Sequence, residues 1–145
     1  MTGWTIKAFK IKNGALIVDT PDITFPEKTI GAFGYFLLER TSNNTVFDIP
    51  TDFIYTGALD NPGEILELRD NAGQLKDKVG HLTETGQVVP WYFGHNASKS
   101  TMERINPTNP GNEPSNWQTN KGTAKNGLDA EGNPINGTPR AKNSK

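Results

Sequence analysis

The stretch that decides the fold is residues 34–40, which read GYFLLER. Its four successive apolar or aromatic residues are too few for a globular helix and are rich in β-forming types. The pattern predicts a central strand that is covered on both faces. Its expected neighbour is residues 64–70, EILELRD, where Leu66 and Leu68 share one face of a second strand. Two such strands indicate a β-sandwich.

The rest of the chain repeats this pattern of short strands separated by turn signals. Further strands are predicted at residues 4–12, 15–18, 23–25, 53–56, 75–79, 101–105 and 116–119. Asn13-Gly14 predicts a hairpin turn, and a slip of the apolar positions near Ala8 predicts a bulge or a strand end there. No segment has a convincing helical period. The sequence therefore predicts an all-β protein, with an immunoglobulin-like β-sandwich over residues 1–119.

Composition and charge divide the chain into two parts. The 145 residues suit one domain, and the absence of cysteine excludes disulfides and thiolate metal sites. Residues 1–119 carry 10 basic and 14 acidic side chains, which argues against a broad phosphate-binding face. Residues 120–145 carry five basic and two acidic side chains and no aromatic residue. We expect this second part to be an extended or flexible C-terminal tail.

Catalytic, metal-binding and membrane-spanning patterns are missing from the sequence. His81 and His95 are the only histidines, and a zinc site needs three or four ligands. Glu64 and Glu67 lie three apart on one predicted strand and so face opposite ways, unlike a glycosidase pair. Residues 129–133 alternate acidic or amide groups but lack the distant glutamate of a calcium loop. We therefore predict no enzyme activity, no cofactor, no metal and no membrane span, and we see no signal peptide in this segment.

Five short motifs, in their order and spacing, resemble the lamin tail domain family. They are GWTI at residues 3–6, GYFLLER at 34–40, NPGEILEL at 61–68, TMER at 101–104 and NW at 116–117. The resemblance covers residues 3–119, and residues 129–134 and 137–139 are similar to the end of bacterial members. Family members usually begin with an additional strand before the Gly-Trp motif, with which this sequence begins. The resemblance thus implies a fragment of a larger protein, or an open sheet edge that another segment or another copy covers.

Two groups of side chains are candidates for binding a partner. Lys76 and Lys78 lie on one face of a predicted strand, where they either meet an anionic partner or protect a sheet edge from aggregation. Trp91 and Tyr92, with His95 nearby, either stack on a sugar or a base or close one end of the core. Both readings of each group stay open at this point.

Three charged residues need partners if the predicted strands are correct. Asp77 would face inward between the two lysines, where a buried carboxylate must find hydrogen-bond donors. Glu103 and Arg104 form either a ligand-binding pair or a structural one, in which Arg104 ties a loop to the sandwich by charge-assisted hydrogen bonds.

The resemblance implies a non-catalytic interaction or tethering module of a larger, exported or cell-surface bacterial protein. Its partner would be a protein or a cell surface, and its location extracellular. One alternative is a DNA-binding domain that uses exposed lysines and the basic tail. The other is a carbohydrate-binding module that uses Trp91 and Tyr92.

Overall fold

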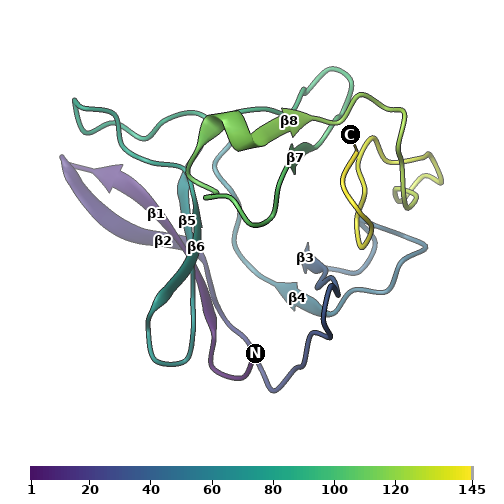
Figure 1. The fold of residues 1–145 in the computed structure, drawn as a ribbon, viewed down its shortest axis with the longest axis horizontal. Helices are drawn as coiled ribbons and strands as arrows, with labels where there is room; N and C mark the ends of the chain where they lie inside the picture. Colours follow the sequence, from purple (N-terminus) through teal and green to yellow (C-terminus); the bar gives the residue numbers. More distant parts are fainter. Residues whose placement is uncertain (145) are drawn as a thin grey trace.

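The computed structural model describes residues 1–144, and its sheets form an all-β sandwich (Figure 1). The strands are β1 (Thr5–Lys12), β2 (Ala15–Thr24), β3 (Leu38–Arg40), β4 (Phe53–Tyr55), β5 (Ile65–Arg69), β6 (Leu75–Val79), β7 (Met102–Arg104) and β8 (Trp117–Thr119). A single 3-10 turn, η1 (Pro114–Asn116), precedes β8. The helical structure in the described residues is too short to span a bilayer.

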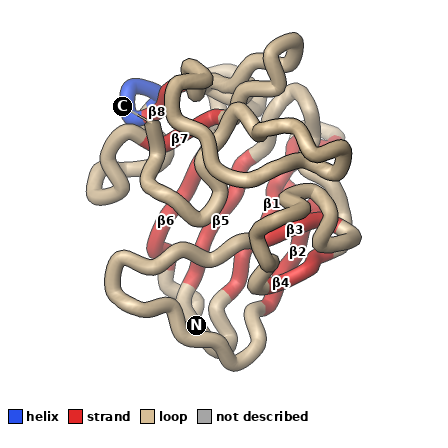
Figure 2. Tube along the Cα trace, turned by 90° about the vertical axis from the view of Figure 1, so that its right-hand side faces the viewer, coloured by secondary structure: helices blue, strands red, loops and turns tan. Residues whose placement is uncertain are grey.

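The first layer is a four-stranded antiparallel sheet in the order β2-β1-β5-β6, whose strands lie side by side in Figure 2. Asn13 and Gly14 both have positive φ, 53° and 76°, as a two-residue type I′ hairpin turn requires. The predicted hairpin between β1 and β2 is therefore confirmed. The pairing with β2 shifts register between Lys7 and Ala8, which confirms the irregularity predicted near Ala8.

The second layer consists of two short strand pairs, β3 with β4 in parallel and β7 with β8 antiparallel. The buried apolar side chains of the core are Ala8, Ile23, Phe25, Val46 and Ile65. Phe25 meets Phe36 edge-on with 5.3 Å between ring centroids, and it lies 6.3 Å from Phe53. These ring contacts join the end of the first sheet to the segment that leads into the second layer.

The prediction for residues 34–40 is only partly correct. The strand begins at Leu38, and it pairs with β4, whereas the neighbours of β5 are β1 and β6. At Leu37, directly before the strand, the backbone N–H donates to the Asp52 carboxylate at 2.8 Å instead of to a neighbouring strand. Phe33 has a left-handed φ of 58°, which turns the chain away from an extended path. The predicted neighbour and the predicted length of this central strand are therefore wrong.

Residues 120–144 contain no named helix or strand, in keeping with their composition, but they are anchored to the sandwich. The backbone of Leu128 accepts a hydrogen bond from Phe47 and donates one to the Asp48 carboxylate. Asn136 bonds to Thr101, and Ser144 is buried against Glu103. This segment therefore forms part of the folded unit instead of a free extension.

Candidate functional site

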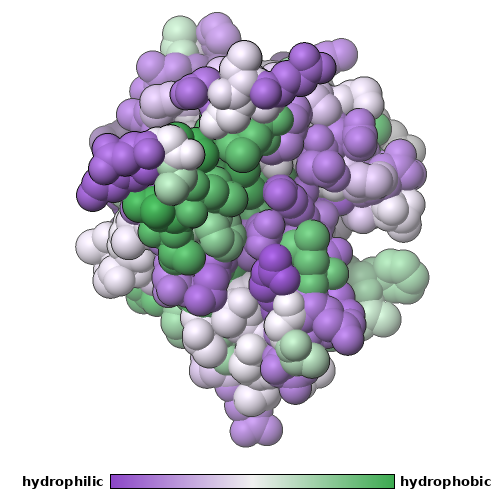
Figure 3. Space-filling view, turned by 90° about the vertical axis from the view of Figure 1, so that its left-hand side faces the viewer, coloured by the Kyte–Doolittle hydropathy of each residue, from purple (hydrophilic) through white to green (hydrophobic). Residues whose placement is uncertain are grey.

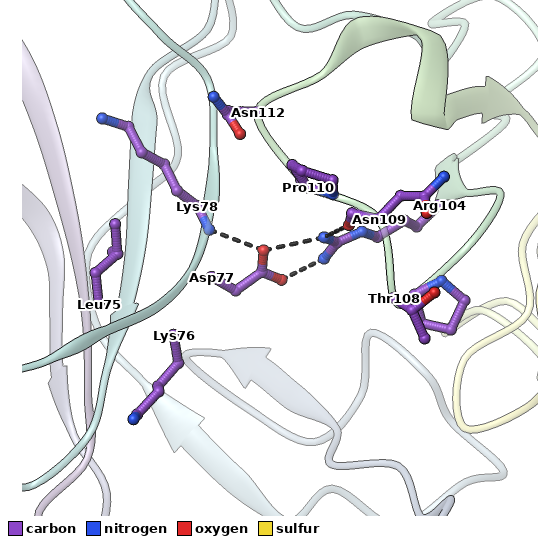
Figure 4. Close-up of a pocket in the computed structure, with 11 residues that line it drawn as sticks. Leu75, Lys76, Asp77, Lys78, Arg104, Thr108, Asn109, Pro110 and Asn112 are labelled. Atoms are coloured by element: carbon purple, nitrogen blue, oxygen red, sulfur yellow. Dashed lines mark hydrogen bonds and ion pairs between the residues drawn. The ribbon is translucent and has the colours of Figure 1, made fainter.

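A polar pocket of about 380 Å³ lies between β6 and the loop of residues 107–112 (Figure 4). At its centre, Arg104 from β7 donates hydrogen bonds from both Nη atoms to the two carboxylate oxygens of Asp77 from β6. Arg104 also donates to the backbone carbonyl of Asn109 at 2.5 Å. Asp77 thus faces inward and finds the donors that its position requires. The geometry supports the structural interpretation of Arg104, which ties a loop to the sandwich.

The same groups cover part of the β6 edge. The Lys78 N–H donates to Asp77 Oδ1 at 2.9 Å, so this backbone donor is already used. Gly111 packs so closely that a Cβ added there would lie 2.5 Å from the Lys78 carbonyl oxygen. Trp117 Nε1 donates to the Gly111 carbonyl at 2.8 Å and fixes the loop in place. An additional strand therefore cannot pair with β6 at Lys78.

The candidate lysines face carboxylates across the sheet. Lys76 Nζ lies 2.9 Å from Asp70 and Lys78 Nζ lies 3.4 Å from Glu67. Two further pairs repeat this arrangement on β1 and β2, Lys7–Asp22 and Lys10–Asp19. The hydrogen bond from Lys76 holds the pKa of Asp70 below its usual range. Charges of opposite sign therefore alternate on this sheet instead of forming one broad positive surface, and Asp77 and Gly111, not these lysines, cover the backbone at the β6 edge.

The polar atoms of the Trp91 and Tyr92 side chains make hydrogen bonds within the chain. Trp91 Nε1 donates to the Asp60 carbonyl at 2.8 Å. The Tyr92 hydroxyl donates to the Asn112 carbonyl at 3.1 Å and lies 2.9 Å from His81 Nδ1. Burial raises the pKa of Tyr92. Both rings are half-buried, so their placement supports a role in closing the end of the core.

His95 lies apart from these rings, in an exposed turn where its Nδ1 is 2.9 Å from Ser98 Oγ. Asp129 likewise stabilises the turn in which it lies, because its carboxylate accepts hydrogen bonds from the backbone N–H groups of Glu131 and Asn133. The Asn133 N–H holds the pKa of Asp129 below its usual range. Across residues 1–144, no three His, Cys, Asp or Glu side chains are grouped so that they could hold a metal ion.

Glu103 is a buried carboxylate with a complete set of donors. Asn120 Nδ2 and Thr138 Oγ1 each donate to its Oε1 at 2.8 Å, and the Ser144 N–H donates to its Oε2 at 2.9 Å. Burial opposes ionisation of Glu103, but these hydrogen bonds outweigh it and lower its pKa. Glu103 therefore anchors the C-terminal segment and is occupied by that role.

A further cavity, of about 570 Å³, lies between residues 33–35, Ile105 and residues 142–144, and the sequence did not predict it. Phe33 stands at its mouth with its side chain fully exposed, and Tyr35 and Ile105 are about half exposed. The one sequence signal for this site is an aromatic residue between two nearby glycines, Gly31-Ala32-Phe33-Gly34, directly before the predicted central strand.

Comparisons with models of protein families, with curated proteins and with solved structures find no match to this chain. The local geometry of its pockets and edges therefore carries the functional argument.

Proposed function

We propose that this chain is a non-catalytic interaction module that docks a partner protein at the cavity beside Phe33. The observation that carries the proposal is the state of Phe33, a large aromatic residue that is fully exposed and has a φ of 58°. A left-handed conformation costs a residue with a Cβ about 1 kcal/mol. A turn closed by the Gly34 N–H and the Gly31 carbonyl at 2.9 Å holds the ring in this position. Backbone strain of this kind persists mainly at functional sites.

The surroundings of Phe33 indicate the chemistry of the partner. Tyr35, Ile105 and Pro107 give the cavity an apolar wall, while Lys142 and Asn143 lie on its polar side. Exposed aromatic anchors beside apolar pockets are typical of the residues that contribute most to protein association. The fitting partner is therefore a protein segment that presents an apolar or aromatic side chain with polar groups on either side.

The two alternatives have less support in the geometry. DNA binding needs cations that are available for phosphates, but four of the five lysines on the four-stranded sheet already face carboxylates. Sugar stacking needs open aromatic faces, whereas Trp91 and Tyr92 are half-buried and hydrogen-bonded internally. The lamin tail resemblance, the immunoglobulin-like form of the sandwich, the bacterial source and the extracellular or cell-surface location stay predictions from the sequence.

The test is a selection of displayed peptides on the immobilised chain. We expect the Phe33→Ala variant to bind the enriched peptides about thirtyfold more weakly, because truncation of a central aromatic anchor costs about 2 kcal/mol of binding free energy. The matched control is Phe93→Ala, which removes another exposed ring that does not line this cavity and should leave binding unchanged. Peptides that bind both variants equally would contradict the site. Turnover of phosphodiester, ester or glycoside substrates by the purified chain would contradict a non-catalytic module.

A further inference from the structure

The free edge of β2 presents a regular row of backbone groups. The two-residue turn at Asn13-Gly14 is closed by the pair Lys12 and Ala15. In a tight hairpin this pair exchanges both hydrogen bonds, and bonded and non-bonded pairs then alternate along the ladder. Ile17 therefore bonds to β1, while the N–H and C=O groups of Leu16 and Val18 point away from the sheet. In the part of the chain that the structure describes, β2 has no strand on that side.

The side chains at this edge are apolar as well as exposed. Leu16 is 47% exposed and Val18 is 49% exposed. Their cross-strand partners on β1 are Ile11 and Phe9, so all four side chains lie on the outer face of the sheet. Figure 3 shows an apolar patch on the side of the molecule where β1 and β2 lie. An edge with exposed apolar residues and unpaired backbone groups is a template for pairing with another strand.

We propose that this edge pairs with the same edge of a second copy of the chain, independently of partner docking at Phe33. The strands run antiparallel about a two-fold axis at Ile17, so that Leu16 of one copy lies opposite Val18 of the other. Each of these pairs exchanges two backbone hydrogen bonds, and together they satisfy all the outward groups of Leu16 and Val18. The result is one continuous eight-stranded sheet, with the two apolar patches adjacent on its outer face.

The pattern of charge on β1 and β2 fits this register. Asp19 of one copy lies opposite Ala15 of the other, and Ala15 is next to Lys12 on β1. Because alanine is small, Lys12 can reach over it toward the Asp19 of the second copy. Asp19 would then lie between Lys12 and its own Lys10, with which it already pairs at 2.6 Å. The self-complementary arrangement of these charges favours a second copy over an unrelated strand.

The other edge explains why association stops at two copies. On β6 the backbone at Lys78 is covered by Asp77 and by Gly111, so a further strand cannot pair there and extend the eight-stranded sheet. A two-fold contact closes on itself. The paired segment has about five residues on each side, which places the dimer among weak interfaces that form at high protein concentration.

Cysteine cross-linking tests the register, because the chain contains no cysteine. Non-bonded pairs have Cα atoms about 4.5 Å apart, within disulfide range, so Ile17→Cys should form a covalent dimer. Ala15→Cys is the matched control on the same face. Its two copies would lie about 14 Å apart along the strands and should stay uncross-linked. Equal cross-linking of both variants, or none in Ile17→Cys, would overturn the proposal.

Two measurements on chains without cysteine complete the test. Between about 10 µM and 1 mM protein, amide exchange at Leu16 and Val18 should slow at least about fivefold, while that of Ile17 stays constant. Sedimentation should show a monomer–dimer equilibrium that Val18→Lys abolishes and that Leu75→Lys, an equally exposed position on β6, leaves intact. A monomer at every concentration, assemblies larger than a dimer, or dimers with unprotected Leu16 and Val18 amides would each overturn the proposal.

Discussion

The two edges of the four-stranded sheet differ, because the backbone is partly covered at β6 and uncovered at β2. At β6, Asp77 and Gly111 cover the backbone at Lys78, and the two lysines of the strand pair with carboxylates. At β2, Leu16 and Val18 leave apolar side chains and backbone groups exposed. The difference shows that edge protection is built locally, by one carboxylate and one loop, and that a bare edge can persist in the same sheet. The predictions below perturb one edge and use the other as its control.

The largest effect should come from Gly111→Ala. Its new Cβ would lie 2.5 Å from the Lys78 carbonyl oxygen and 2.9 Å from Asp77 Oδ1, so the loop must move away from β6. We expect a loss of about 3 kcal/mol in the free energy of unfolding, measured by urea denaturation. Gly14→Ala, near the β2 edge, meets no atom within 4 Å and should cost only about 1 kcal/mol for its positive φ. Equal costs would show that Gly111 does not cover the β6 edge tightly.

Asp77→Ala should have the next largest effect. It removes the two carboxylate oxygens that accept hydrogen bonds from Arg104, whose side chain is only 16% exposed, and it leaves the Lys78 N–H unpaired. We expect thermal and urea unfolding to report a loss of about 2 kcal/mol. The control is Asp22→Ala at the β2 side, where the pair with Lys7 is exposed and should contribute less than about 0.5 kcal/mol. A similar loss of stability in both variants would show that Asp77 does not have this structural role.

Two of the buried glutamates, Glu64 and Glu103, should respond to pH in opposite directions. Hydrogen bonds outweigh burial and lower the pKa of Glu103 in β7, so its ionised form stabilises the fold above its unfolded pKa, and this is lost as pH falls through the folded pKa. Burial raises the pKa of Glu64, which lies near Asp19 of β2, so its ionised form destabilises the fold near neutrality.

Urea unfolding at pH 7 should therefore show that Glu103→Gln destabilises the chain and that Glu64→Gln stabilises it. Both differences should shrink as the pH falls, that of Glu64 between its raised folded pKa and its unfolded pKa, and that of Glu103 at the lower pH of its folded pKa. The same sign for both variants at neutral pH would contradict the assigned environments.

The smallest effect should come from Lys76→Ala on β6. Its pair with Asp70 is exposed, so stability should change by less than about 0.5 kcal/mol. Because Asp77 and Gly111 keep the Lys78 backbone covered, sedimentation should show no new association of this variant. Aggregation of Lys76→Ala would show instead that the lysines, and not Asp77 and Gly111, protect the β6 edge from pairing.

Local patterns predicted much of the sheet and one part of the site. Asn13-Gly14 specifies its hairpin through backbone preference, and alternation along β6 placed Asp77 inward, where Arg104 meets it. The path of residues 34–37 was not predictable in this way. Their apolar run fits a buried strand, but Asp52, 15 residues beyond Leu37, takes the backbone N–H. Such a contact leaves no periodic signal in the sequence.

The C-terminal segment was hard to predict for a different reason. Composition detects segments that bury apolar surface, whereas residues 120–144 are held mainly by polar contacts such as those of Asn120 and Ser144 with Glu103. Phe33 raised the opposite difficulty, because an aromatic residue normally indicates a core position. Its exposure follows from a turn geometry that only the structure shows.

The anchoring of Ser144 to Glu103 determines how the role of the basic C-terminal residues can be studied. Truncation after residue 119 would delete the three residues that donate hydrogen bonds to the buried Glu103 carboxylate, so a binding assay on a shortened chain would not separate the loss of charge from misfolding. Replacing Lys121, Lys125 and Lys142 with glutamine removes the charge and keeps every donor to Glu103. Charge neutralisation at full length is therefore the informative experiment, and deletion mapping would misassign the effect.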